Sequence, residues 1–175
     1  MAEIFPGGNW SHTLSRDLAD CHRRVYYRVY GSWGGWNRYR NGETPAKLYL
    51  LKQTRTLEMH VGVTVHGAIK AILEAYRRGQ SFETDRLVDR IEVRLRGELE
   101  YSREKRWEQE RTPKAAPLIL IEHLRGELIA PEREQALIDR AKSCLRNFCV
   151  DHLPRLLSLG ADHWDRIDEM DAVPY

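Results

Sequence analysis

Residues 59–74 read MHVGVTVHGAIKAILE, an apolar run that contains two glycines and an internal histidine, His66. Apolar residues that recur at three or four positions predict a helix with one buried face. The residues expected to share this face are Val65, Ile69, Ile72, Leu73 and Tyr76. At about 100° per residue, His66 is predicted to point inward, close to Ile69 and Leu73. Gly62, one turn earlier, leaves the backbone open to a neighbouring element or a bound ion.

Two interpretations of an inward His66 remain open at this point. In the first, it is a core histidine whose ring nitrogens are satisfied by backbone carbonyls. In the second, it is a metal ligand beside an accessible backbone. The spacing alone does not decide between them.

Outward from this stretch, most of the chain has the apolar periodicity of helices. Before it, Leu18, Cys21, Val25 and Val29 predict a helix that Gly31 ends, followed by a turn-rich loop over 32–45. The stretch from Ala46 to Gly79 is predicted to be helical, with a break near Gly62. The chain is therefore expected to be mainly α.

The second half of the chain continues this pattern. A helix is predicted from Thr84, whose buried face would hold Leu87, Ile91, Leu95 and Leu99. The run LILIEHL (118–124) fits a helix or a strand equally. Pro131 is expected to open another helix, and Pro154 to break it. The apolar stripe expected on that helix consists of Leu137, Ala141, Cys144, Leu145 and Phe148.

Length and composition favour one folded domain over residues 1–175. The chain has 175 residues, 42% of them hydrophobic, and a net charge of +2, which is enough apolar material for one core. No apolar run reaches transmembrane length and the N-terminus lacks the order of a signal peptide, so we expect a cytoplasmic protein. Three cysteines, Cys21, Cys144 and Cys149, are expected to be free thiols.

Basic and aromatic residues alternate through HRRVYYRVYGSWGGWNRYR (22–40). Guanidinium groups bind phosphates and aromatic rings stack on unpaired bases, so this segment suits single-stranded or frayed DNA. The alternative is that the tyrosines pack in the core while the arginines form a solvated face. The candidate nucleic-acid-binding residues are Arg23, Arg24, Tyr26, Tyr27, Arg28, Trp33, Trp36, Arg38 and Arg40.

Three motifs in order carry a resemblance to a known family. They are Cys21, Arg23, Arg24, Tyr26 and Tyr27; then Gly62 and His66; then Trp107, Pro113, Lys114, Glu122, His123, Gly126 and Glu127. Together they resemble the N-terminal part of the PD-(D/E)XK nuclease superfamily, in its RecB-like branch, over nearly the entire chain. The proline that usually follows the cysteine is His22 here.

The resemblance implies the helical N-terminal portion of a restriction-endonuclease-like α/β nuclease fold. It also implies that His66 is a metal ligand that acts with an Asp and with a Glu-x-Lys motif on strands. Such a set holds Mg²⁺ or Mn²⁺ and activates a water. These carboxylates and the lysine are expected outside the 175 residues or on another polypeptide, so the chain alone is expected to be inactive.

Two further groups of residues bear on the family pattern. The acidic cluster Asp162, Asp165, Asp168, Glu169 and Asp171 lacks a following lysine, and we expect it to be a solvated tail rather than a set of metal ligands. Some RecB-like nucleases hold an iron–sulfur cluster, and Cys21 stands where its first ligand would be. Cys144 and Cys149 do not match the later ligands, so no cluster is expected in this chain.

Two functions follow as expectations. The first is the N-terminal part of a metal-dependent DNA nuclease, incomplete as given, in which the basic and aromatic surface guides the strand. The alternative is a non-catalytic or split nuclease-like module that binds a protein partner or nucleic acid. The expected partners are therefore DNA and either a second polypeptide that supplies the catalytic sheet or a second copy of this chain; no membrane is expected.

Overall fold

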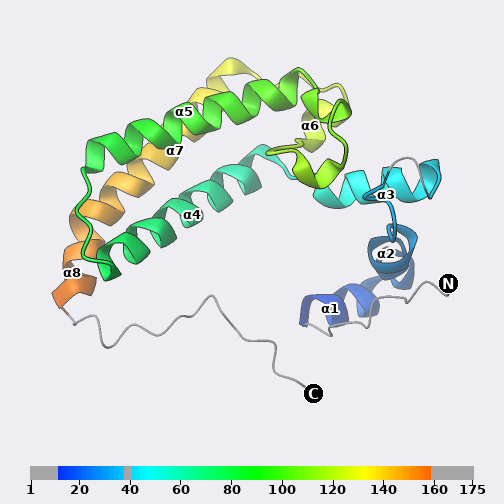
Figure 1. Cartoon of the computed structure of the whole chain (residues 1–175), viewed down its shortest axis with the longest axis horizontal. Coiled ribbons are helices and arrows are strands. Elements are labelled where there is room, and N and C mark those ends of the chain that lie inside the picture. The colour runs from blue at the N-terminus through cyan, green and yellow to red at the C-terminus, as the bar shows by residue number, and fades with distance from the viewer. Residues whose placement is uncertain (1–11, 38–40, 159–175) are drawn as a thin grey trace. The chain divides into compact units, whose positions relative to one another are not determined.

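A computed structural model describes residues 12–37 and 41–158, and these residues are mainly helical (Figure 1). The only β-pairing among them is an isolated parallel bridge between Arg55 and Leu120. The prediction of a mainly α chain is confirmed. The helices are α1 (His12–Asp20), α2 (His22–Val25), η1 (Tyr26–Gly31), α3 (Glu43–Gln53), α4 (Leu57–Arg77), α5 (Thr84–Arg103), η2 (Arg106–Glu108), η3 (Pro113–Ala115), α6 (Ile121–Leu124), α7 (Pro131–Asn147), η4 (Phe148–His152) and α8 (Leu153–Ser158).

The chain divides into two compact units. The first unit comprises Met1–Leu57 and Gly97–Ile129, and the second comprises Glu58–Arg96 and Ala130–Tyr175. Each unit is built from two stretches that are far apart in the sequence. The expectation of a single domain over residues 1–175 stays a prediction.

In the second unit, α4, α5 and α7 lie alongside one another (Figure 1). The predicted apolar stripe of α5 is confirmed, since Ile91 and Leu95 are buried together with Val88. On α7 the buried residues are Ile138, Ala141 and Leu145, which recur at three and four positions as an amphipathic helix requires. Polar contacts join α5 to α7 along their length: Arg146 with Asp85, Lys142 with Glu92, and Arg96 with Gln135.

In the first unit, a buried polar network joins the end of α5 to α6. The Ser102 hydroxyl accepts a hydrogen bond from the Leu120 backbone N–H (3.0 Å) and lies 2.9 Å from Nδ1 of His123. The backbone N–H of Leu57 donates to Oε1 of Glu122 at 3.1 Å. Ser102 is fully buried, so this serine–histidine pair is structural and has no access to a substrate.

Several boundaries differ from the sequence predictions. The break expected near Gly62 lies at residues 54–56, because Arg55 pairs with Leu120 there and interrupts the helical hydrogen bonds. Pro154 does not end the helical path, because the backbone passes without a break from α7 through the π-helix η4 into α8, of which Pro154 is the second residue. The ambiguous run 118–124 contains both kinds of structure, since Leu120 forms the bridge and Ile121 begins α6.

Some residues predicted to lie on buried faces are exposed instead, Tyr76 and Cys144 among them. Tyr76, near the end of α4, is 38% exposed. Cys144 of α7 is also exposed. The buried residues of this region include Ile138 and Cys149, which were not predicted as members of the stripe. The apolar stripes were therefore predicted on the correct helices, but not every member of a stripe is covered.

Three predicted helix ends are confirmed. Gly31 ends η1, and Pro131 opens α7 at its first position. Gly79, with a φ of 69°, follows the end of α4. The Gly79 N–H donates to the carbonyl of Tyr76, which satisfies an acceptor at the helix end.

Candidate nucleic-acid interface and the position of His66

Three tyrosines lie exposed along the short π-helix η1. Tyr26 is 57% exposed, Tyr27 49% and Tyr30 46%. Their rings contact one another: the centroids of Tyr26 and Tyr27 are 5.5 Å apart edge to face, and those of Tyr26 and Tyr30 are 6.3 Å apart. Val25 is the buried residue of this segment. The alternative in which these tyrosines pack in the core is therefore wrong.

The arginines around these rings are exposed but differ in their ion pairs. Asp17 of α1, itself 6% exposed, pairs with Arg28 at 2.5 Å and with Arg24 at 3.4 Å. Within the described part of the chain, Arg23 forms no ion pair. Arg23 therefore presents a charge that Asp17 does not neutralise, whereas Asp17 fixes the other two guanidinium groups near η1.

The loop after η1 is more packed than its glycine content suggests. Trp33 is half-buried and Trp36 is exposed, and their rings meet edge to face at 4.9 Å. The ring centroid of Trp36 also lies 6.1 Å from that of Tyr49 in α3. A Cβ on Gly35 would stand 2.0 Å from the backbone oxygen of Pro45, so this glycine allows the loop to approach α3 closely. The tryptophans thus join the loop to α3, with Trp36 also open to solvent.

Most of the residues predicted to bind nucleic acid lie on this surface of the first unit. The structure brings together Arg23, Arg24, Tyr26, Tyr27, Arg28, Trp33 and Trp36 within α2, η1 and the loop that follows. Arg38 and Arg40 lie outside the described residues. Tyr30 is a further member of this surface, because it is exposed like Tyr26 and Tyr27 and its ring contacts Tyr26. Its position among the alternating basic and aromatic residues is the feature of the sequence that indicates it.

His66 lies on the exposed side of α4, and its predicted inward orientation is wrong. The buried residues of α4 are Leu57, His60, Val61, Thr64 and Ile72. The buried side of α4 differs from the predicted side because the helix carries apolar residues on most of its sides. The periodicity of the sequence alone therefore could not show which side is covered by other helices. The buried histidine is His60, 2% exposed, which the apolar pattern did not indicate.

A metal site at His66 would need further ligands beside its imidazole. In residues 12–37 and 41–158, no group of three or more His, Cys, Asp or Glu side chains is placed to hold a metal ion. His66 is therefore not a member of such a group within these ranges. The acidic cluster 162–171 lies outside the described residues.

The cysteines of the described residues are free thiols, as predicted. Cys21 and Cys144 are exposed and Cys149 is buried. Burial raises the pKa of the Cys149 thiol, while a hydrogen bond with Thr84 acts in the opposite direction. The surroundings of Cys149 are those of a core residue.

Comparison with models of protein families, with curated proteins and with solved structures found no match for this chain. No helix in the described ranges is both long enough and apolar enough to cross a membrane.

Proposed function

We propose that this chain is the helical, strand-binding part of a metal-dependent DNA nuclease of the PD-(D/E)XK superfamily. The observation that supports it best is the exposure of Tyr26, Tyr27 and Tyr30 beside arginines. Three large rings left in solvent on one short helix are available to stack on unpaired bases, and each stacked base contributes about 1–3 kcal/mol. Membership in the superfamily rests on the motif resemblance.

The arginines give this surface its expected salt dependence. Arg23, without an ion pair among the described residues, is available to neutralise a phosphate. Arg24 and Arg28 share Asp17, so part of their charge is already compensated and each adds less to binding. A strand would therefore run with its bases on the tyrosine rings and its backbone near Arg23.

Binding of a fluorescent single-stranded oligonucleotide, measured by anisotropy over a salt series, tests this proposal. Tyr26→Ala should weaken binding by roughly 1–3 kcal/mol if a base stacks on that ring. Arg23→Ala should reduce the slope of log affinity against log salt by about 0.7, since one phosphate contact to a single strand is lost. Arg28→Ala should have a smaller effect than Arg23→Ala.

Matched controls come from the second unit. Tyr76→Ala removes an exposed tyrosine, and Arg140→Ala an exposed arginine, far along the chain from η1. Both variants should bind like the unmodified chain. Equal binding by Tyr26→Ala, Arg23→Ala and these controls would show that the surface is only solvated.

A second candidate is a non-catalytic or split nuclease-like module that binds a protein partner. It is favoured by the exposed side of α4, where Met59 (59% exposed) and Val63 (54% exposed) accompany His66. A Cβ added to Gly62 or Gly67 on this helix would meet nothing within 4 Å among the described residues, so another backbone could approach there. A reading frame that continues past Tyr175 into a strand with an Asp and a Glu-x-Lys motif would favour a single-chain nuclease instead.

A further inference from the structure

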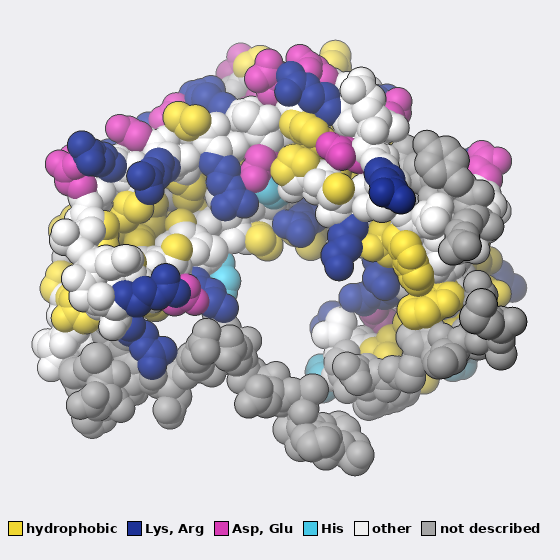
Figure 2. Space-filling model, in the orientation of Figure 1, with side chains coloured by type: hydrophobic (Ala, Val, Ile, Leu, Met, Phe, Trp, Pro, Cys, Tyr) yellow, Lys and Arg dark blue, Asp and Glu magenta, His cyan; other side chains and the backbone are white. Residues whose placement is uncertain are grey.

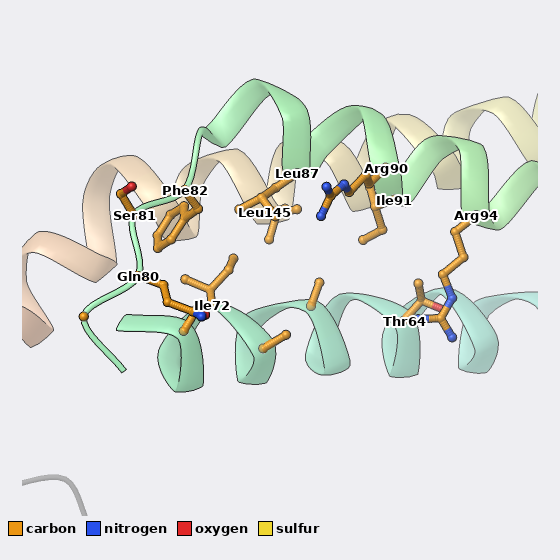
Figure 3. A pocket seen from close by; sticks show the side chains of 14 residues that line it. Thr64, Ile72, Gln80, Ser81, Phe82, Leu87, Arg90, Ile91, Arg94 and Leu145 are labelled. Atoms are coloured by element: carbon orange, nitrogen blue, oxygen red, sulfur yellow. The ribbon is translucent and has the colours of Figure 1, made fainter. Parts of the chain in front are cut away.

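The second unit contains a cleft of about 840 Å³ between α4 and α5. Its lining is mostly apolar: Ile72, Phe82 and Leu87 point into it, and Leu145 of α7 lies behind (Figure 3). On the face shown in Figure 2, hydrophobic side chains gather between α4 and α5 with Lys and Arg side chains beside them. A cleft of this volume and composition is typical of a binding site for a small molecule.

Small side chains on α4 leave this space open. Ala68, Ala71 and Ala75 line the α4 side of the cleft, and Leu87 and Ile91 line the α5 side. Because an alanine side chain ends at its Cβ, these three residues do not fill the space towards α5 as larger core side chains would. An apolar surface that is open to water is stabilised when an apolar group covers it.

The charged groups of the cleft are both basic. Among the described residues that line it, Arg90 and Arg94 carry the charges, and they lie one turn apart on α5. Figure 3 shows the Arg94 side chain reaching towards Thr64 of α4, while Phe82 and Ile72 lie towards the opposite end. Arg90 forms no ion pair with another described residue. The occupant should therefore carry an anionic group at the arginine end, and a carboxylate matches the planar donors of a guanidinium.

The length of the cleft limits the size of the apolar part of its occupant. The cleft extends along α4 from Thr64 to Ala75, a stretch that spans roughly 16 Å at 1.5 Å per residue. Carbon–carbon bonds are about 1.5 Å long, so an extended zigzag chain of about twelve carbons has this length. A longer chain would leave carbons in water, and a shorter chain would leave apolar lining uncovered.

We propose that the second unit binds a free fatty acid with a straight chain of about twelve carbons in the cleft between α4 and α5. The carboxylate lies beside Arg90 and Arg94. The alkyl chain runs along the three alanines of α4 towards Phe82. This site shares no residue with the tyrosine and arginine surface of η1, and it does not rest on the function proposed above.

Isothermal titration calorimetry of the full chain with sodium dodecanoate, kept below the concentration at which it forms micelles, tests the proposal. We expect a single saturable site. From octanoate to dodecanoate, affinity should rise by up to about fourfold per added methylene, because each methylene is removed from water. Hexadecanoate should gain little over dodecanoate, since its additional carbons extend beyond the cleft. Dodecyltrimethylammonium has the same alkyl chain with a positive head group and should bind more weakly.

Two substitutions separate the head-group contact from the apolar contact. Arg90→Glu should weaken dodecanoate binding on the order of fivefold, because an attraction becomes a repulsion, and it should strengthen the binding of dodecyltrimethylammonium. Ala71→Leu should weaken the binding of both ligands on the order of tenfold, because the larger side chain occupies the cleft. Arg90 and Ala71 are exposed, so both variants should retain the helix content of the unmodified chain, which circular dichroism checks.

Arg140→Glu and Ala136→Leu are the matched controls, since Arg140 and Ala136 are exposed on α7 and do not line the cleft. Both variants should bind dodecanoate like the unmodified chain. Binding without saturation, or equal binding by Arg90→Glu, Ala71→Leu and these controls, would overturn the proposal, because dodecanoate would then coat the surface without a site.

Three other results would also overturn it. Affinity that keeps rising from dodecanoate to hexadecanoate would show that the cleft does not hold the chain. Binding to phosphatidylglycerol vesicles but not to dissolved dodecanoate would identify the occupant as a membrane lipid. No binding of any of these ligands by the unmodified chain would leave a helix of a partner protein as the occupant.

Discussion

Cys149 is the cysteine whose surroundings change its chemistry. It is 9% exposed, and burial raises the pKa of its thiol. A raised pKa lowers the fraction of reactive thiolate at any pH below that pKa, and burial also hinders access. Cys21 and Cys144 are exposed in the folded chain. The three thiols should therefore differ in their rates of alkylation.

At pH 8, iodoacetamide should modify Cys21 and Cys144 first and Cys149 last, and raising the pH should speed Cys149 because more of it becomes thiolate. Peptide mass spectrometry at successive times measures this order. In denaturant the three rates should converge, which is the control. Alkylation of Cys149 as fast as Cys144 in the folded chain would contradict its placement in the core.

At the scale of an element, two glycines are expected to respond oppositely to the same substitution. A Cβ on Gly35 would meet the Pro45 backbone at 2.0 Å, and one on Gly67 in α4 meets nothing within 4 Å among the described residues. Gly35→Ala must displace the loop or α3, at a cost of about 1–3 kcal/mol. Gly67→Ala should stabilise α4 by roughly 0.5–1 kcal/mol, because alanine loses less backbone freedom in a helix.

Urea unfolding monitored by circular dichroism measures both variants against the unmodified chain. The midpoint should fall for Gly35→Ala and rise for Gly67→Ala. A fall for Gly67→Ala would mean that something already covers this side of α4 in the isolated chain. No loss of stability in Gly35→Ala would contradict the close approach of the loop to α3.

At the scale of the whole molecule, the chain as given should not hydrolyse DNA with Mg²⁺ or Mn²⁺. A metal-dependent hydrolase needs several ligands to position the ion and its water. The described residues contain no cluster of three ligands, and His66 can supply only one. Incubation with a labelled DNA strand and gel analysis should show no products. Cleavage that His66→Ala abolishes would overturn this prediction.

Local signals in the sequence were enough to predict which segments are helical and where several of them end. The stripe of α5 and the positions of Gly31, Gly79 and Pro131 are such signals, and local backbone preferences suffice to interpret them. The sequence also indicated the tyrosines and arginines of α2 and η1 as candidate binding residues, because the charge and aromaticity of a side chain do not depend on packing. Whether those tyrosines were buried was left open.

Which sides of these helices are covered depends instead on how the helices pack. α4 is apolar on most sides, so its neighbours α5 and α7 select Val61, Thr64 and Ile72 for burial and leave His66 exposed. The break at Arg55 depends on its pairing with Leu120, and the hydrogen bond beside it joins Leu57 to Glu122, 65 positions further along the chain. Contacts of this range are set by packing, and no local pattern in the sequence specifies them.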